Sequence, residues 1–159
     1  MKTIVLTALV VTAIGSQAFA SPPPINNSVA TQTGKCLAYY EASARNDMMT
    51  SATLVMLGQR NQNELALNEA VVFLSNRAAK NITKHADLDA AFKEAIQHEP
   101  DSAVKASAIK TEDVVYNATL ASLSAGYGNN AQNAATYVIN IKATVLECDD
   151  WFSDDNSDE

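Results

Sequence analysis

Proline is almost missing from the chain after its first two dozen residues, and this absence favours helix. The four prolines stand at positions 22, 23, 24 and 100, so long stretches carry no residue that interrupts an α-helix. Aromatic residues make up only 6% of the chain, and no alternating β-branched run lies between Asn-Gly or Asp-Gly turns, which leaves little basis for a sheet. Alanine, the best helix former, is abundant. The sequence therefore predicts an all-α fold.

Patterns that indicate an enzyme are also missing. The chain contains no Gly-x-Ser-x-Gly or His-Glu-x-x-His pattern and no Cys-x-x-Cys-His haem site. Glu94 and His98 have the spacing of two metal ligands on one helix face, but two ligands do not make a site, and a solvated ion pair or a capping contact is the favoured explanation. We therefore expect no catalytic residues, no metal and no cofactor.

Basic residues are scarce, which argues against nucleic acid or an anionic membrane as a partner. The net charge is −7, with 11 Lys and Arg against 18 Asp and Glu, whereas binding to either polyanion needs a basic surface. Seven of the acids lie within the last thirteen residues: Glu147, Asp149, Asp150, Asp154, Asp155, Asp158 and Glu159. Residues 153–159 are predicted to form an acidic, disordered tail that would attract a basic protein.

The first twenty residues are typical of a bacterial export signal. Lys2 provides the positive start, Ile4–Ile14 is an uncharged and mainly apolar run, and Ala18-Phe19-Ala20 matches a signal peptidase site. The run is shorter than the roughly 20 residues that span a bilayer, and no later stretch approaches that length. We expect cleavage after Ala20, no membrane span, and a periplasmic or secreted protein that is a monomer or a weak homo-oligomer.

Apolar residues recur at helical spacing along most of the remaining chain. The clearest pattern places six residues on one face of a helix between residues 129 and 152: Ala134, Val138, Ile141, Val145, Cys148 and Phe152. Weaker patterns predict helices at about 35–57, 62–83, 87–98 and 111–125, with a short segment at 101–109. Gly34 is expected to mark the start of the first helix and Gly58 its end. Residues 21–33 are predicted to be an extended leader, so that the helical domain spans 34–152.

The two cysteines lie near the two ends of this domain. Cys36 and Cys148 are expected to pair in an oxidising compartment, and closing the 112-residue loop would stabilise the fold by about 4–5 kcal/mol in the chain-entropy model. Two free thiols, or a bond between chains, are the alternatives. The sequence thus predicts a small antiparallel helical bundle of about five helices closed by one disulfide. Joining the first helix to the last needs an even number of crossings, which five helices do not give.

Four aromatic residues adjoin the cysteines and form the predicted binding site. They are Tyr39, Tyr40, Trp151 and Phe152. A disulfide would gather all four at one end of the bundle, and Trp and Tyr are frequent in binding hot spots. The alternative is a small core that packs around the bond.

These features favour an exported protein-binding module, such as an inhibitor, an immunity-type protein or a stress chaperone, whose partner contacts the aromatic end and the acidic tail. The alternative is a carrier that holds a small apolar ligand between its helices, with Met48, Met49 and Met56 lining an adaptable cavity. An enzyme that uses an unrecognised carboxylate pair is the third hypothesis.

Overall fold

The computed structural model of the protein describes residues 25–58, 64–126 and 131–154, with side chains described over 25–58, 67–125 and 138–151. Within these ranges there are no strands, and the helices are α1 (Asn27–Gly58), α2 (Glu64–His98), α3 (Ser102–Gly126) and α4 (Ala131–Asp154). The all-α class is confirmed, but the described residues form four helices rather than five. The predicted export signal and residues 155–159 of the predicted tail lie outside the described residues.

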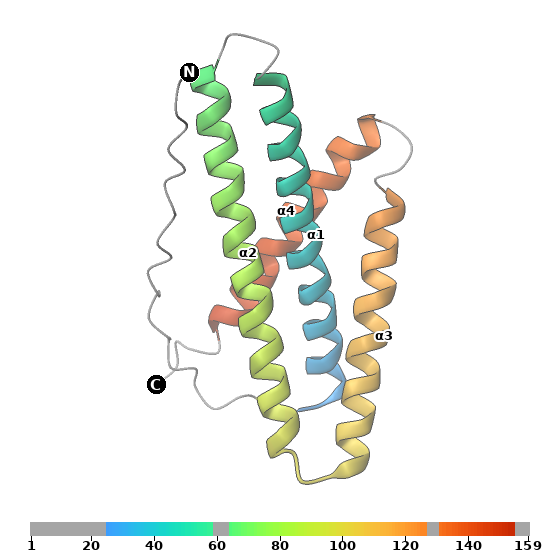
Figure 1. Cartoon of the computed structure of the whole chain (residues 1–159). Helices are drawn as coiled ribbons and strands as arrows, with labels where there is room; N and C mark the ends of the chain where they lie inside the picture. The colour runs from blue at the N-terminus through green and yellow to red at the C-terminus, as the bar shows by residue number, and fades with distance from the viewer. Residues whose placement is uncertain (1–24, 59–63, 127–130, 155–159) are drawn as a thin grey trace.

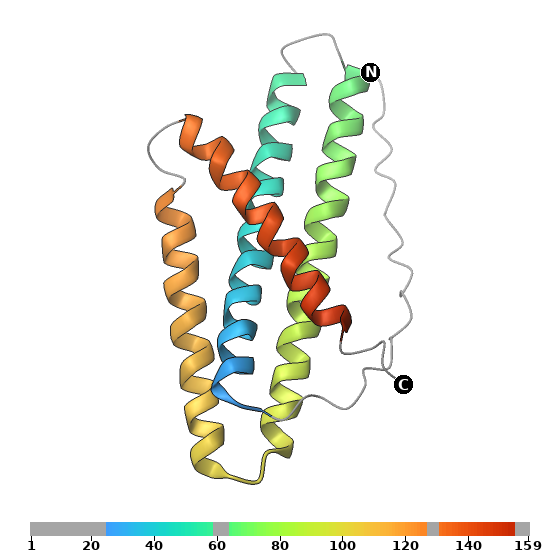
Figure 2. The same cartoon turned by 180° about the vertical axis from the view of Figure 1, so that it is seen from behind.

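α1 is the central helix of the bundle. It contacts the other three helices, with α2 along one side and α3 along the other, and successive helices run in opposite directions (Figure 1). α4 crosses this layer obliquely (Figure 2). Because four helices cross the molecule an even number of times, the C-terminal part of α4 returns to the N-terminal half of α1. The difficulty that five helices posed for the disulfide is thereby removed.

α2 is a single helix where the sequence predicts two. The predicted break at residues 84–86 is absent because inward-facing residues continue across it at spacings of three and four. These residues are Ala78, Asn81, Leu88 and Phe92, all buried, and His85, whose ring meets Tyr116 edge-on. Asp87 and Asp89, predicted as caps, lie within the helix instead: Asp87 is exposed, and Asp89 pairs with Lys93 one turn later.

The first turns of α1 and α3 are capped by side chains that directly precede each helix. Asp101, at the start of the predicted short segment, caps the whole of α3, since its carboxylate accepts hydrogen bonds from the backbone N–H groups of Ala103 (2.7 Å) and Val104 (3.2 Å). The side chain of Asn26 accepts one from Val29 N–H at 2.9 Å. α1 therefore begins about two turns earlier than predicted, and residues 27–33 are helical rather than extended.

Gly34 lies inside α1, where it permits a close approach of α3, and does not mark the start of the helix. A Cβ atom on Gly34 would lie 2.5 Å from the backbone oxygen of Glu112 and 3.1 Å from the backbone nitrogen of Tyr116. The buried small residues Ala30, Ala38 and Ala42 continue this contact strip at spacings of four. The two backbones pack closely because this strip of α1 carries almost no side-chain volume.

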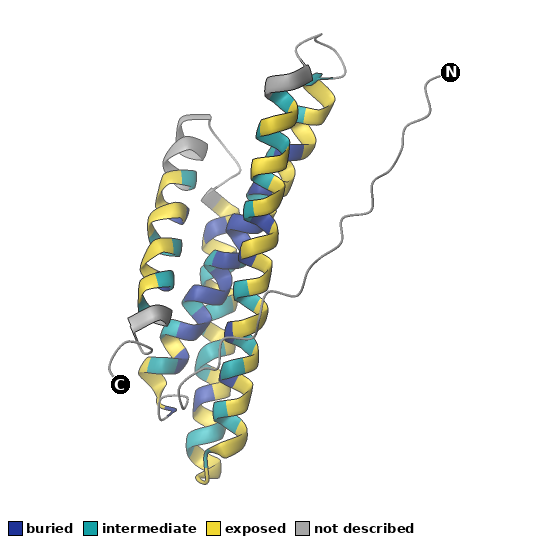
Figure 3. Ribbon diagram, turned by 90° about the vertical axis from the view of Figure 1, so that its left-hand side faces the viewer, coloured by how far each residue is buried: buried dark blue, intermediate teal, exposed yellow. Residues whose placement is uncertain are grey.

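The apolar core occupies only the N-terminal part of α1 and its neighbours. It consists of three clusters: Cys36, Leu37, Tyr40, Leu88 and Cys148 around the disulfide; Ile25, Ala30, Phe92 and Ala108; and Ala42, Leu123 and Ile141. Among the residues whose side chains are described, none between Ala44 and Ala78 is both apolar and buried. The buried residues therefore concentrate in the middle and lower parts of the molecule, and the upper end of the α1–α2 hairpin is mostly exposed (Figure 3).

Replacing Gly34 by alanine is expected to lower the free energy of unfolding by about 1–2 kcal/mol, because overpacking outweighs the gain in helix propensity. Urea unfolding followed by circular dichroism measures the change. Gly58→Ala is the matched control, since its Cβ would meet only the Leu67 side chain at 3.4 Å. A Gly34→Ala protein as stable as the wild type would show that α1 and α3 are not in close contact at this point.

Candidate protein-binding site

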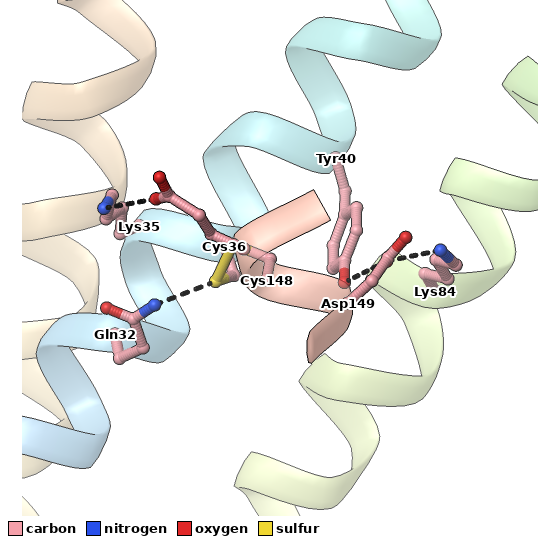
Figure 4. Close-up of a disulfide and its surroundings, with 8 residues drawn as sticks. Gln32, Lys35, Cys36, Tyr40, Lys84, Cys148 and Asp149 are labelled. Atoms are coloured by element: carbon pink, nitrogen blue, oxygen red, sulfur yellow. Dashed lines mark hydrogen bonds and ion pairs between the residues drawn. A yellow bond between two sulfur atoms is a disulfide. The ribbon is translucent and has the colours of Figure 1, made fainter. Parts of the chain in front are cut away.

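The disulfide end, where the sequence places the binding site, is a packed clamp that holds α4 on α1. Cys36 and Cys148 form the predicted bond, with both residues buried and their Cα atoms 5.6 Å apart. Figure 4 shows the polar contacts that surround it. Gln32 Nε2 donates to Cys36 Sγ at 3.5 Å, and Lys35 Nζ lies 3.8 Å from a carboxylate oxygen of Glu147.

Tyr40, one of the predicted contact residues, belongs to this clamp. It is only 2% exposed, and its hydroxyl donates a 3.0 Å hydrogen bond to Asp149. Asp149 also pairs with Lys84, whose ammonium lies 5.7 Å from the centre of the Tyr40 ring. Burial, reinforced by the Asp149 carboxylate, raises the pKa of the Tyr40 hydroxyl far above its ordinary value. Tyr40 joins α1, α2 and α4 and is a core residue rather than a contact residue.

The other predicted contact residues do not form one surface with Tyr40. Tyr39 packs against the cluster of Ala42, Leu123 and Ile141, and Trp151 packs against the cluster around the disulfide. The side chain of Phe152 lies outside the described residues. Trp151 also borders an open groove of about 580 Å³, together with Asn27, Ser28, Val29, Thr31 and Gln32. The described aromatic residues thus pack as the core alternative expects.

Exposed apolar residues gather at the opposite end of the α1–α2 hairpin, which extends beyond the end of α3 (Figure 1). Of twelve large apolar side chains recorded as exposed in the described residues, seven lie here, each 44–62% exposed. We refer to these seven as the tip surface: Met48, Met49, Val55, Met56 and Leu57 on α1, with Val72 and Phe73 on α2. The other five are scattered over α2, α3 and α4, as single exposed apolar residues are on most proteins.

The space between the two helices in this part of the hairpin is lined by polar side chains. Asp47 is 1% exposed and accepts hydrogen bonds from Nε of Arg77, at 2.6 Å, and from its Nη2. The hydrogen bond to Asp47 raises the pKa of the Arg77 guanidinium, and partial burial acts in the opposite direction. Further pairs flank this one, and we refer to all three as the polar ladder: Ser43 with Asn81, Asp47 with Arg77, and Ser51 with Ser75.

Around the polar ladder, α1 turns polar residues toward α2 and apolar residues outward, the reverse of an ordinary amphipathic helix. Nearer the tip, Leu54, Leu67, Val71 and Leu74 are half-buried, and the Leu67 side chain lies next to Gly58. Ser43, Asp47 and Ser51 recur every four positions and occupy the strip of α1 that meets α2, while the tip surface occupies much of the remaining circumference. Apolar side chains contribute to stability only when water is removed from them. In a single chain the side chains of the tip surface remain about half exposed to water. A partner that covers them would therefore add their hydrophobic free energy to the stability of the complex.

The sequence carried a signal for this site that the helical patterns did not use. Residues 48–59 contain no charged side chain, and Asp47 directly precedes this apolar stretch. Met48, Met49 and Met56 are 47–59% exposed. They lie on the outside of the hairpin. The carrier hypothesis requires them to line an enclosed cavity, and they do not.

No family model matches the chain, and comparisons with curated proteins and with solved structures found no match either. Within the described residues, no helix has both the length and the apolarity that crossing a membrane requires. A functional assignment therefore rests on the geometry and chemistry of this chain's own residues.

Replacing Asp47 by alanine is expected to lower the free energy of unfolding by about 2–3 kcal/mol, because Arg77 then stays in the hairpin without its carboxylate. The double variant Asp47→Leu/Arg77→Met should recover most of this loss, since it removes both charges and keeps the volume. Asp89→Ala, which breaks the exposed pair with Lys93, is the control and should change stability by less than about 1 kcal/mol. Urea unfolding measures all three. Equal losses in the Asp47 and Asp89 variants would contradict a buried ladder.

Proposed function

We propose that the protein is an exported protein-binding module that holds apolar segments of other proteins on the tip surface. The observation that carries this proposal is the group of seven exposed apolar side chains on a hairpin whose two helices meet partly through buried polar pairs. Large exposed apolar patches mark interaction sites, because leaving them in water forgoes their contribution to stability. The predicted contact site at the disulfide end is less suitable, since Tyr40 is buried there.

The composition of the tip surface supports a chaperone-like role over a dedicated inhibitor or immunity protein. Three of its seven residues are methionines, whose unbranched and polarisable side chains adapt to differently shaped partners. Phe73 adds an aromatic anchor, and the Arg77 guanidinium carbon lies 5.4 Å from its ring centre. With no charge between residues 48 and 59, the α1 part of the surface selects for apolar segments rather than for charged ones.

Export rests on two observations of different kinds. Lys2, the apolar run and Ala18-Phe19-Ala20 match a secretory signal. The bond between Cys36 and Cys148 is of the structural type that persists in oxidising compartments and is rare in the cytosol. Both support the proposal of a periplasmic or extracellular protein, to which unfolded segments of other exported proteins would be available.

Binding is tested with a permanently unfolded client, fluorescently labelled carboxymethylated lactalbumin, by fluorescence anisotropy. The wild-type protein is expected to bind it saturably. Met56→Lys and Phe73→Lys should each weaken binding at least about tenfold, because each would place an unpaired ammonium against an apolar segment.

Ile139→Lys is the matched control for these variants. Ile139 is 65% exposed and lies on α4, outside the tip surface, so its replacement should leave the affinity unchanged. Failure of the wild type to bind this client, or equal weakening by the lysines at positions 139 and 56, would overturn the proposal.

A further inference from the structure

The hairpin tip lacks the neighbours that helices have elsewhere in the bundle. Leu123, close to the end of α3, packs beside Ala42, and so does Ile141 of α4. α1 continues to Gly58, about 20 Å further at 1.5 Å per residue, with α2 alone beside it. A helix pair must bury its apolar side against another layer, and the common solution for antiparallel pairs is a four-helix bundle. The tip provides two of those four helices.

A second copy of this chain supplies the other two with matching chemistry. In a two-fold dimer the same patch meets itself, so the uncharged α1 part of the tip surface meets its own copy, while exposed Glu69 borders the α2 part. Residues 48–59 bring no charge into such an interface. The polar ladder keeps Asp47 and Arg77 paired between α1 and α2, so docking leaves that pair intact. The seven large side chains together expose on the order of 600 Å² around the hairpin, which is an upper bound on what one interface covers and compares with ~800 Å² per partner in a standard interface.

The distribution of charge favours the tip over other contacts between copies. Glu147, Asp149 and Asp150 lie near the C-terminal end of α4, which is in the half of the molecule away from the tip (Figure 1). Charges further apart than about 8 Å are largely screened at physiological ionic strength. Copies that meet tip to tip therefore keep their acidic ends beyond the range of repulsion, whereas copies that meet at the disulfide end do not.

From these observations we infer that a second copy covers the tip surface, tip against tip, and that client segments compete with it for the same side chains. This inference rests on the proposed function. The dimer is the form in which the tip surface is protected from water, and the monomer is the form that binds a client. Dilution shifts the equilibrium toward monomer because dimer formation depends on protein concentration. A client also shifts it toward monomer, because the client binds only the monomer.

Sedimentation velocity of the signal-free protein over a concentration series tests the inference. The wild type is expected to shift from monomer to dimer as concentration rises, and to return to monomer when the unlabelled lactalbumin probe is added. Met56→Lys and Val55→Lys should raise the dimer dissociation constant at least about tenfold, since each copy would bring an ammonium into the interface. Ile139→Lys should behave as the wild type. Circular dichroism confirms that each variant is folded.

Pyrene attached at Thr53→Cys, on the exposed side of the tip, locates the contact independently of any lysine variant. Excimer emission should rise with dimer concentration for this label. It should not rise for pyrene at Asn117→Cys, a control position exposed on α3.

The alternative outcomes separate this inference from the proposed function. A protein that stays monomeric at all concentrations but binds the probe through the tip surface would contradict the tip-to-tip dimer. The proposed binding function would then still hold. A dimer that is unaffected by the tip lysines would place the interface elsewhere and overturn the inference. Flotation of a monomer with phosphatidylcholine vesicles, abolished by Met56→Lys, would assign the tip to a lipid surface and also overturn it.

Discussion

The disulfide between Cys36 and Cys148 determines which part of the central helix is covered. It holds the end of α4 against the third turn of α1, and α4 crosses α1 obliquely near the middle of α1 (Figure 2). The contact at Gly34 sets α3 beside the N-terminal half of α1. Both helices end before α1 does, and α2 is the only described helix long enough to accompany it. The exposed hairpin tip is thus a direct consequence of where α4 is attached.

The two halves of the hairpin are stabilised by different kinds of interaction. Around the disulfide, apolar clusters exclude water, and polar groups such as Tyr40 and Asp149 complete one another's hydrogen bonds. In the upper part of the hairpin, the Asp47–Arg77 pair fixes the position of α2 along α1 more than it adds to the free energy of folding. The reason is that the cost of desolvating two charges offsets much of their attraction. With these polar pairs holding part of the hairpin, seven large apolar side chains stay exposed and are available for another molecule.

Helical periodicity and the cysteine pair were sufficient to predict the all-α class, the last helix and the covalent link. The boundaries were less predictable, because caps depend on single side chains such as Asn26 and Asp101 that occur equally often in loops. Gly34 was interpreted as a helix boundary, although its role depends on a backbone 78 residues away in the chain. Such long-range packing leaves no local pattern.

The burial of Tyr40 could not be predicted for a related reason. Aromatic residues next to a disulfide are as typical of a core as of a contact surface, and only tertiary structure shows that Tyr40 is enclosed by α2 and α4. Periodicity also assumes that apolar strips face inward, an assumption that fails at Met48 and Val55 because Asp47 and Ser51 occupy the inner side. A charged residue directly before an apolar stretch, with a possible counter-ion on the next helix, was the available signal.

The most direct test of the tip surface is the oxidation rate of its own methionines. After removal of the predicted signal, Met48, Met49 and Met56 are the only methionines in the chain, so hydrogen peroxide reports on the tip without any substitution. Mass spectrometry of tryptic peptides should show slow oxidation at high protein concentration or with client bound, and faster oxidation after dilution. Equal, rapid oxidation of all three under every condition would contradict the conclusion that the tip is a binding surface.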